Sequence, residues 1–309
     1  MKYSKTKQLL AGMVMTAMCG LTVQAQTPIY AVNGFGGTGG GTSGINASPT
    51  TAPAGSTSLT DLGATPSLSF GTGPNGVAGE SIVNAATGQP GAQVLAGTVG
   101  ASSSLSAFTI TMWVNENTAT LNNYRIMEMS PGAPATTGAA DGTKLFFGVN
   151  AGGGLQFYVN NVNGNTVATD IATAGTWNNS GTLGALNANT WYFEAVTYDS
   201  VAGNALLYSG SQSSAATLAY TYGANVTSAG NLDLSTASSI ALLDRFSGGR
   251  DFPGSLDDVN IYSGALTQSQ LDAIRIGELA PVPEPGTLAM LGLGGVLSII
   301  AGFRRRAGR

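Results

Sequence analysis

The side chains of this chain that could do chemistry are carboxylates. The 309-residue sequence contains no histidine, and its only cysteine, Cys19, lies in an apolar segment near the N-terminus. Nucleophiles activated by histidine are therefore excluded, because a Ser-His or Cys-His pair needs an imidazole as its general base. What remains is acid–base chemistry by paired Asp or Glu, or the binding of a cation by carboxylate oxygens.

The glutamates are poorly spaced for glycoside hydrolysis, which requires two carboxyl groups facing each other across the scissile bond. Glu194 and Asp199 share one predicted strand at the wrong spacing, and Glu116 and Glu128 lie in separate segments. We therefore predict that the protein is not an enzyme. Alternation places Glu194 on the same strand face as Val196, and a carboxylate there is expected to be either paired or exposed on the sheet.

Net charge favours cations as ligands. Between the two terminal segments the chain has five basic and fifteen acidic residues, a net charge of −10. Nucleic acid is excluded as a partner, because binding a phosphate backbone requires clustered Lys and Arg. Asp257 and Asp258 are neighbours at the start of the last predicted strand, where one of them could cap a turn or pair with Arg245 or Arg250. We interpret Asp244, like the other isolated aspartates, as an ordinary turn acid.

Aromatic side chains outside the strongest strand patterns are candidate ligand-binding residues. Trp177, Tyr220 and Tyr222 have this property, and aromatic rings can stack on sugars through their apolar faces. The alternative for all three is packing in the core or at a sheet edge. Trp113 and Trp191 lie inside clear strand patterns and are interpreted as sheet residues.

Residues 1–25 have the pattern of a signal peptide. Three lysines precede the apolar run Leu9–Val23, and Val23-Gln24-Ala25 supplies the small residues that signal peptidase needs. The mature chain would begin at Gln26 and contain no cysteine. Disulfides and thiol catalysis are then excluded, so stability must come from packing, hydrogen bonds or metal.

The C-terminus has a different targeting pattern. Pro283, Glu284 and Pro285 precede an apolar run, Gly286–Phe303, and three arginines follow it: Arg304, Arg305 and Arg306. The run is just long enough to form a transmembrane helix, which needs about 17 to 25 residues. The arginines would stay on the cytoplasmic side and leave the preceding domain outside.

Between these ends the composition favours short strands joined by turns, because charged residues make up only 9% and the sequence contains 45 glycines. No helical period appears before Thr267, which favours an all-β sandwich or jelly roll. The predicted strands are Ile29–Val32, Ser67–Phe70, Glu80–Asn84, Ala107–Asn115, Tyr124–Ser130, Thr143–Val149, Gly154–Asn160, Trp191–Asp199, Ala205–Ser209, Ser239–Leu243 and Leu256–Tyr262.

Three details of this pattern bear on the fold. Ala107–Asn115 alternates as a half-buried strand does. A capping box, Thr267 with Gln270, predicts one short helix after the last strand, with Leu271 and Ile274 facing the sheet. Residues 26–66 are interpreted as a loop or linker in which Ile29–Val32 is a potential first strand; the alternative is a long insertion between the first two strands of the domain.

Three segments together resemble laminin-G-like domains of the concanavalin A-like jelly-roll superfamily: Phe108–Val114, Trp191–Tyr208, and Phe252–Tyr262 with the following Ala265-Leu-Thr. The resemblance assigns residues 67–280 to one such domain and implies two antiparallel sheets packed face to face. It also implies Ca²⁺ as a cofactor near Asp257, the first choice, and Asp258. The Glu-x-Asp-x-x-Glu pattern of glycosidases in this superfamily is absent.

Residues 281–309 resemble a PEP-CTERM sorting tail. The resemblance implies processing by signal peptidase and an exosortase, after transient anchoring in the inner membrane by the C-terminal helix; a plain membrane anchor is the alternative. We expect a secreted, surface-sorted binding or matrix module associated with extracellular polysaccharide or biofilm matrix. The alternative is a structural or protein-binding adhesion module without glycan affinity.

Overall fold

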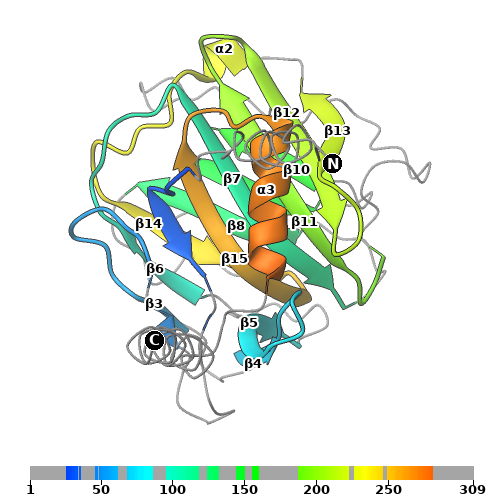
Figure 1. Cartoon of the computed structure of the whole chain (residues 1–309). Coiled ribbons are helices and arrows are strands. Elements are labelled where there is room, and N and C mark those ends of the chain that lie inside the picture. Colours follow the sequence, from blue (N-terminus) through cyan, green and yellow to red (C-terminus); the bar gives the residue numbers. More distant parts are fainter. Residues whose placement is uncertain are drawn as a thin grey trace, which may run out of the picture.

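The computed structural model describes residues 26–33, 35, 46–47, 49–61, 68–85, 95–117, 124–131, 144–149, 155–159, 187–222, 226–245 and 249–280. In this part the chain forms two antiparallel β-sheets and one long helix (Figure 1). The predicted signal helix and C-terminal helix lie outside the described residues. Among the helices that are described, none has the length and apolar character needed to cross a membrane.

The first sheet has the strand order β13-β12-β11-β7-β15-β5-β4, with β1 also paired to β15. Its central strand, β7, is flanked by the two longest pairings of the sheet. The strands are β1 (Tyr30–Val32), β4 (Leu68–Thr72), β5 (Ala78–Asn84), β7 (Ala107–Glu116), β11 (Trp191–Asp199), β12 (Asn204–Ser211), β13 (Thr217–Tyr222) and β15 (Gly254–Ser263).

The second sheet has the order β10-β9-β8-β14-β6-β3-β2. Its strands are β2 (Asn46–Ala47), β3 (Leu59–Asp61), β6 (Leu95–Val99), β8 (Tyr124–Pro131), β9 (Leu145–Val149), β10 (Leu155–Val159) and β14 (Ser238–Leu242). A single turn of helix, α2 (Val226–Ala229), lies between β13 and β14 in the sequence. The predicted all-β sandwich of two antiparallel sheets is confirmed.

The main hydrophobic core lies between the two sheets. Phe108 and Tyr198 of the first sheet approach to 4.9 Å between ring centroids, and Phe108 lies 6.2 Å from Phe157 of the second sheet. The Tyr198 hydroxyl donates a hydrogen bond to the Val226 carbonyl at 3.0 Å. This aromatic cluster therefore joins both sheets to α2 without leaving the phenolic group unpaired.

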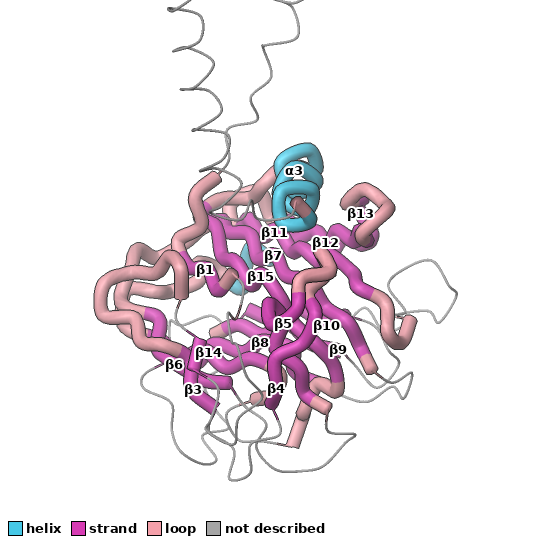
Figure 2. Tube along the Cα trace, turned by 60° about the horizontal axis from the view of Figure 1, so that its bottom comes forward, coloured by secondary structure: helices cyan, strands magenta, loops and turns pink. Residues whose placement is uncertain are grey.

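The outer face of the first sheet is covered by α3 (Gln268–Leu279), so the molecule has three layers (Figure 2). The predicted capping box is present: Thr267 accepts from the Gln270 backbone, and the Gln270 side chain accepts from the Thr267 backbone. Leu271 is completely buried, in a cluster with Trp113 and Phe193. The predicted docking of the helix after the last strand is confirmed.

Strand β7 is consequently buried on both faces, and the half-buried pattern expected for it is wrong. Phe108, Ile110 and Met112 face the core between the sheets, whereas Trp113 faces α3 and is also fully buried. Alternation alone did not reveal this, because Thr109 and Thr111 on the second face are polar residues that normally mark a solvated side.

The segment 26–66 also departs from the linker interpretation. The potential first strand exists as β1 and pairs with β15, while β3 pairs with β6 in the opposite sheet. Leu59 of β3 has no exposed surface and belongs to the main core. The described part of this segment therefore contributes strands to both sheets. Its few apolar residues, such as Tyr30, Val32 and Leu59, are buried in the main core.

Truncating the buried residue of α3 tests the three-layered packing. Leu271→Ala is expected to lower the free energy of unfolding by about 2 to 5 kcal/mol, because it removes buried methyl groups and leaves a cavity against Trp113. Chemical denaturation measures this loss. Ile276→Ala on the exposed side of α3, where 56% of the residue surface is accessible, is the matched control and should cost less than about 0.5 kcal/mol. Equal effects would contradict the packing.

Candidate functional site

The three predicted ligand-binding aromatics are only partly placed. Trp177 lies outside the described residues, and Tyr220 and Tyr222 lie in β13, the edge strand of the first sheet. Tyr220 is half-buried and pairs in register with Leu207 of β12, so one side of its ring packs against the main core. Strand β13 was not predicted from the sequence. Because β13 is the edge strand of the first sheet, Tyr220 lies at a sheet edge.

The two predicted metal ligands lie in β15 at a β-bulge. Asp257 is buried, and its Oδ1 accepts a hydrogen bond from the Asp258 backbone N–H at 2.9 Å. Asp258 has a φ of +47°, in the left-handed region, where the pairing of β15 with β7 is interrupted. The other Asp257 oxygen packs against the β4–β5 turn: a Cβ on Gly73 would lie only 2.5 Å from it.

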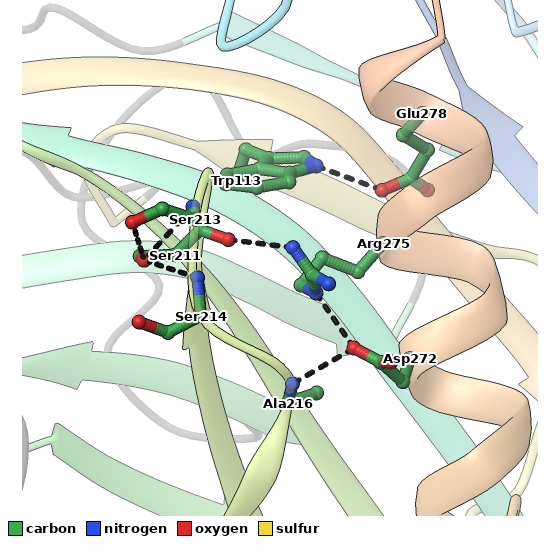
Figure 3. A network of polar contacts seen from close by, with 8 residues as sticks. All are labelled: Trp113, Ser211, Ser213, Ser214, Ala216, Asp272, Arg275 and Glu278. Atoms are coloured by element: carbon green, nitrogen blue, oxygen red, sulfur yellow. Dashed lines mark hydrogen bonds and ion pairs between the residues drawn. The ribbon is translucent and has the colours of Figure 1, made fainter.

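A third carboxyl group, which the sequence analysis did not predict, joins this region from α3. Glu278 accepts hydrogen bonds from Trp113 Nε1 at 2.9 Å and from Asn260 Nδ2 at 3.0 Å; Figure 3 shows the first of them. Burial raises the pKa of Glu278 well above its usual range, and the neighbouring charges of Asp258 and Asp257 raise it further. The two hydrogen bonds of Glu278 therefore fix the last turn of α3 to the sheet.

A signal for Glu278 was present in the sequence. Leu271, Arg275 and Glu278 recur at intervals of four and three, which places them on one face of a helix. The same face that buries Leu271 must therefore carry Glu278 to the sheet. The sequence does not predict that Trp113 is the hydrogen-bond partner of Glu278, because Trp113 belongs to a strand that is remote in the sequence.

Arg275 ties the middle of α3 to the connection between β12 and β13 (Figure 3). Its Nε donates to Asp272 Oδ1 at 2.7 Å, and its Nη1 donates to the Ser211 carbonyl at 2.8 Å. The same Asp272 oxygen accepts from the Ala216 backbone N–H at 3.0 Å. These contacts fix the start of β13, the strand that carries Tyr220, relative to the helix.

The metal prediction remains open at Asp257 and Asp258. Within the described residues, no group of three or more Asp, Glu, His or Cys side chains is arranged to hold a metal ion. One Asp257 oxygen is already engaged with the backbone, so a cation there would need further oxygens from backbone or water. Calcium at this position stays a prediction that rests on the resemblance.

Glu194 is buried and hydrogen-bonded inside the domain. It is 1% exposed and faces the core between the sheets, where the Ser209 hydroxyl of β12 donates to its Oε1 at 2.8 Å. Burial raises the pKa of Glu194 to about 8, although the Ser209 hydrogen bond opposes that shift. We expected a paired or exposed carboxylate; instead it is a buried acid whose partner is the Ser209 hydroxyl group.

Glu116, at the end of β7, has a similar environment. It is 1% exposed, its Oε1 has no hydrogen-bond partner, and burial raises its pKa to about 7. All three glutamates that the sequence offered as acid–base candidates, Glu116, Glu128 and Glu194, are buried in the fold. A glycosidase nucleophile must be an ionised carboxylate that reaches the substrate, and the raised pKa values of Glu116 and Glu194 disfavour the ionised form.

Comparison with known families agrees with this architecture. Residues 87–272, more than half of the chain, match the family model of the concanavalin A-like lectin/glucanases superfamily, Laminin_G_3. The chain belongs to this superfamily. Most of β7, β11, β12 and β15, which form the centre of the first sheet, lie inside the matched region, so the resemblance that the sequence carried is confirmed.

The concanavalin A-like domain is followed by a second match. Residues 281–306 match the PEP-CTERM protein-sorting motif. They include Pro283, Glu284, Pro285 and the three arginines, and the predicted sorting tail is therefore confirmed as a motif. It indicates export and sorting to the cell envelope or the extracellular side.

Solved structures offer more distant similarities. The binding domain of botulinum neurotoxin serotype G has a TM-score of 0.48 and 15% identity, covering 82% of this chain and 51% of that one. The binding domain of Paraclostridial Mosquitocidal Protein 1 has a TM-score of 0.44 and 18% identity, covering 68% and 45%. This chain thus spans about half the length of both. Domain 4 of AbnA, a GH43 extracellular arabinanase from Geobacillus stearothermophilus in complex with arabinotriose, has a TM-score of 0.38 and 17% identity, covering 67% and 81%. A comparison with curated protein sequences finds no match.

The environment of Glu194 predicts a pH-dependent stability. The unfolded chain loses this proton near pH 4.5, whereas the folded chain keeps it until about pH 8. The free energy of unfolding should therefore fall between these values, by up to about 1.4 kcal/mol per pH unit from this group. Glu194→Gln, which cannot ionise, should flatten that slope in denaturant unfolding measured from pH 5 to 8.

Ser209→Ala is the matched control for this measurement. It removes the hydrogen bond to Glu194 but leaves the buried acid in place, so the fall of stability with rising pH should persist. The same pH slope in wild type and Glu194→Gln would contradict the assignment of a buried, protonated Glu194.

Proposed function

We propose that this protein is an exported, non-catalytic module that binds extracellular polysaccharide at the cell surface or in a biofilm matrix. One observation carries the proposal: a concanavalin A-like domain and a PEP-CTERM sorting motif occur in the same chain. The domain family supplies a binding scaffold, and the motif supplies the extracellular location. Fold alone does not choose a ligand, so the glycan is the part that experiment must test.

The carboxyl groups support a role without catalysis. Glu194 and Glu278 are both engaged inside the fold, one with Ser209 and the other with Trp113 and Asn260. Burial raises the pKa of Glu194 to about 8 and raises that of Glu278 well above its usual range, which favours the neutral form of both acids. Hydrolysis of a glycosidic bond by this superfamily's usual chemistry needs one ionised and one protonated carboxyl group across an accessible cleft.

The edge of the first sheet is the proposed glycan contact. Tyr220 is half-buried, and its exposed ring surface is the kind of apolar face on which a sugar ring stacks. Tyr222 follows on the same strand, and Trp177 is included from the sequence. The contacts of Arg275 and Asp272 hold the connection that leads into β13, so the edge would be positioned before a ligand arrives.

The sorting tail supplies the proposed processing partners. Signal peptidase would remove residues 1–25, and the apolar run Gly286–Phe303 would hold the chain in the inner membrane. An exosortase would then cut near the Pro-Glu-Pro signature and release the domain to the outside. The domain's net charge of −10 between the two ends favours neutral or cation-bridged glycans over strongly anionic ones.

Glycan binding can be measured with the purified full chain on a polysaccharide array. Wild type is expected to bind at least one extracellular polysaccharide, and Tyr220→Ala should weaken that binding by about tenfold, since a stacked aromatic contributes roughly 0.5 to 1.5 kcal/mol. Leu218→Ala is the control, because Leu218 is 50% exposed in the same strand and pairs with Tyr208 rather than Leu207. Failure of wild type to bind any polysaccharide would favour the structural or protein-binding adhesion module instead.

Mass spectrometry of the extracellular protein tests the tail. Processing is expected to leave a C-terminus between Val282 and Gly286, because the Pro-Glu-Pro signature precedes the membrane run. Recovery of peptides that contain Arg304 to Arg309 from the mature protein would instead identify a plain membrane anchor. The same sample should lack residues 1–25.

A further inference from the structure

A second carboxyl pair lies away from α3, at the two ends of the connection between β14 and β15. Asp244 has no exposed surface and Asp251 is 3% exposed. Asp244 was interpreted from the sequence as an ordinary turn acid, and Asp251 was not singled out. Two aspartates that are almost completely buried are unusual, because Asp is rarely buried without a partner.

The backbone is organised around Asp244. Its Oδ1 accepts hydrogen bonds from the backbone N–H groups of Arg245 at 2.7 Å and Arg250 at 2.9 Å. The Phe252 N–H donates to the Leu243 carbonyl at 2.7 Å and closes the loop. Leu243 has a φ of +68°, a left-handed conformation that a leucine adopts only when its surroundings impose it.

The remaining oxygens of the pair have no partner. Asp244 Oδ2 and both Asp251 carboxyl oxygens are inaccessible to solvent and accept no hydrogen bond. Neither aspartate forms an ion pair with any Lys or Arg in the described part of the chain. Leaving such a buried group without a hydrogen bond destabilises the folded state, and more so when the group is charged. Three such oxygens at one place call for a ligand.

The two carboxyl groups also face each other. Burial raises the pKa of Asp244 well above its usual range, and the adjacent Asp251 carboxyl raises it further. One shared proton would satisfy two of the three oxygens and leave the third unpaired. A cation can contact all three and compensate the charge at the same time.

We propose that Asp244 and Asp251 bind one divalent cation of the Ca²⁺ class. Carboxylate oxygens are hard ligands, and Ca²⁺ accepts six to eight of them in irregular geometry, so backbone oxygens or water would complete the shell. This site is separate from Asp257 and Asp258, where one Asp257 oxygen is already hydrogen-bonded to the backbone. The cation would be structural: it fixes the loop that leads into β15, the strand next to β7.

Metal content and thermal stability test this site directly. The full chain, purified with CaCl₂ and then passed through metal-free buffer, is expected to retain at least one Ca²⁺ by plasma emission spectroscopy. EDTA should lower its melting temperature by about 5 °C or more, and added CaCl₂ should restore it. Asp251→Asn should bind one Ca²⁺ fewer than wild type, whereas the control Asp257→Asn should keep the Ca²⁺ that Asp244 and Asp251 hold.

Three outcomes would overturn the proposal. The first is a wild-type protein without metal, whose melting temperature responds neither to EDTA nor to CaCl₂; this measurement does not depend on any variant folding. The second is loss of metal in Asp257→Asn but not in Asp251→Asn, which would move the site to Asp257. The third is an Asp251→Asn variant that is more stable than wild type in CaCl₂, as expected for a pair that only shares a proton. Since the site lies apart from Tyr220, these results are independent of glycan binding.

Discussion

The contact between α3 and the outer face of the first sheet is the interaction on which the rest of the domain depends. It buries the side of β7 and β11 that would otherwise face water, and it does so with one fully buried leucine, Leu271, against Trp113 and Phe193. The central strands thereby become the interior of three layers. Strands that are covered on both faces bury apolar side chains on both sides of the sheet. This burial can stabilise the domain with few charged residues and no disulfide.

Burial also determines the state of the acids. Glu278 contacts the sheet because α3 covers that face, whereas Glu194 lies on the opposite face of β11, in the core between the two sheets. In a low-dielectric interior a carboxyl group without a cation stays protonated. Glu194 and Glu278 accordingly act as hydrogen-bonded structural groups. We infer a cation at Asp244 and Asp251 because three of their carboxyl oxygens accept no hydrogen bond within the described part of the chain.

Much of the fold follows from local patterns in the sequence. The β11–β12 hairpin, β15 and the capped helix α3 were all predictable, because clean alternation and a capping box are signals within a few residues. Strands β3, β6 and β13 were not. They are short and rich in small or polar residues, so their existence depends on pairing with distant strands rather than on their own periodicity.

The candidate sites were predictable to a smaller extent. Asp257 was placed correctly in the last strand, but its burial and its contact with the Gly73 turn come from tertiary structure. Asp244 and Asp251 are seven residues apart in a Gly-rich loop, and no periodicity predicts that such residues meet. Their proximity arises because the loop closes between Leu243 and Phe252, and the two strands that it connects, β14 and β15, lie inside different sheets.

The central claim, that the buried carboxyl groups of this domain have a structural role, is tested most directly at Glu194. Carbon-13 NMR of the side-chain carboxyl group, assigned by its loss in Glu194→Gln, reports the protonation state as the pH is varied. We predict a titration midpoint near 8, with the acid protonated at pH 6. A midpoint near the usual value of 4.5 would show an ionised carboxylate in the fold and would contradict the account.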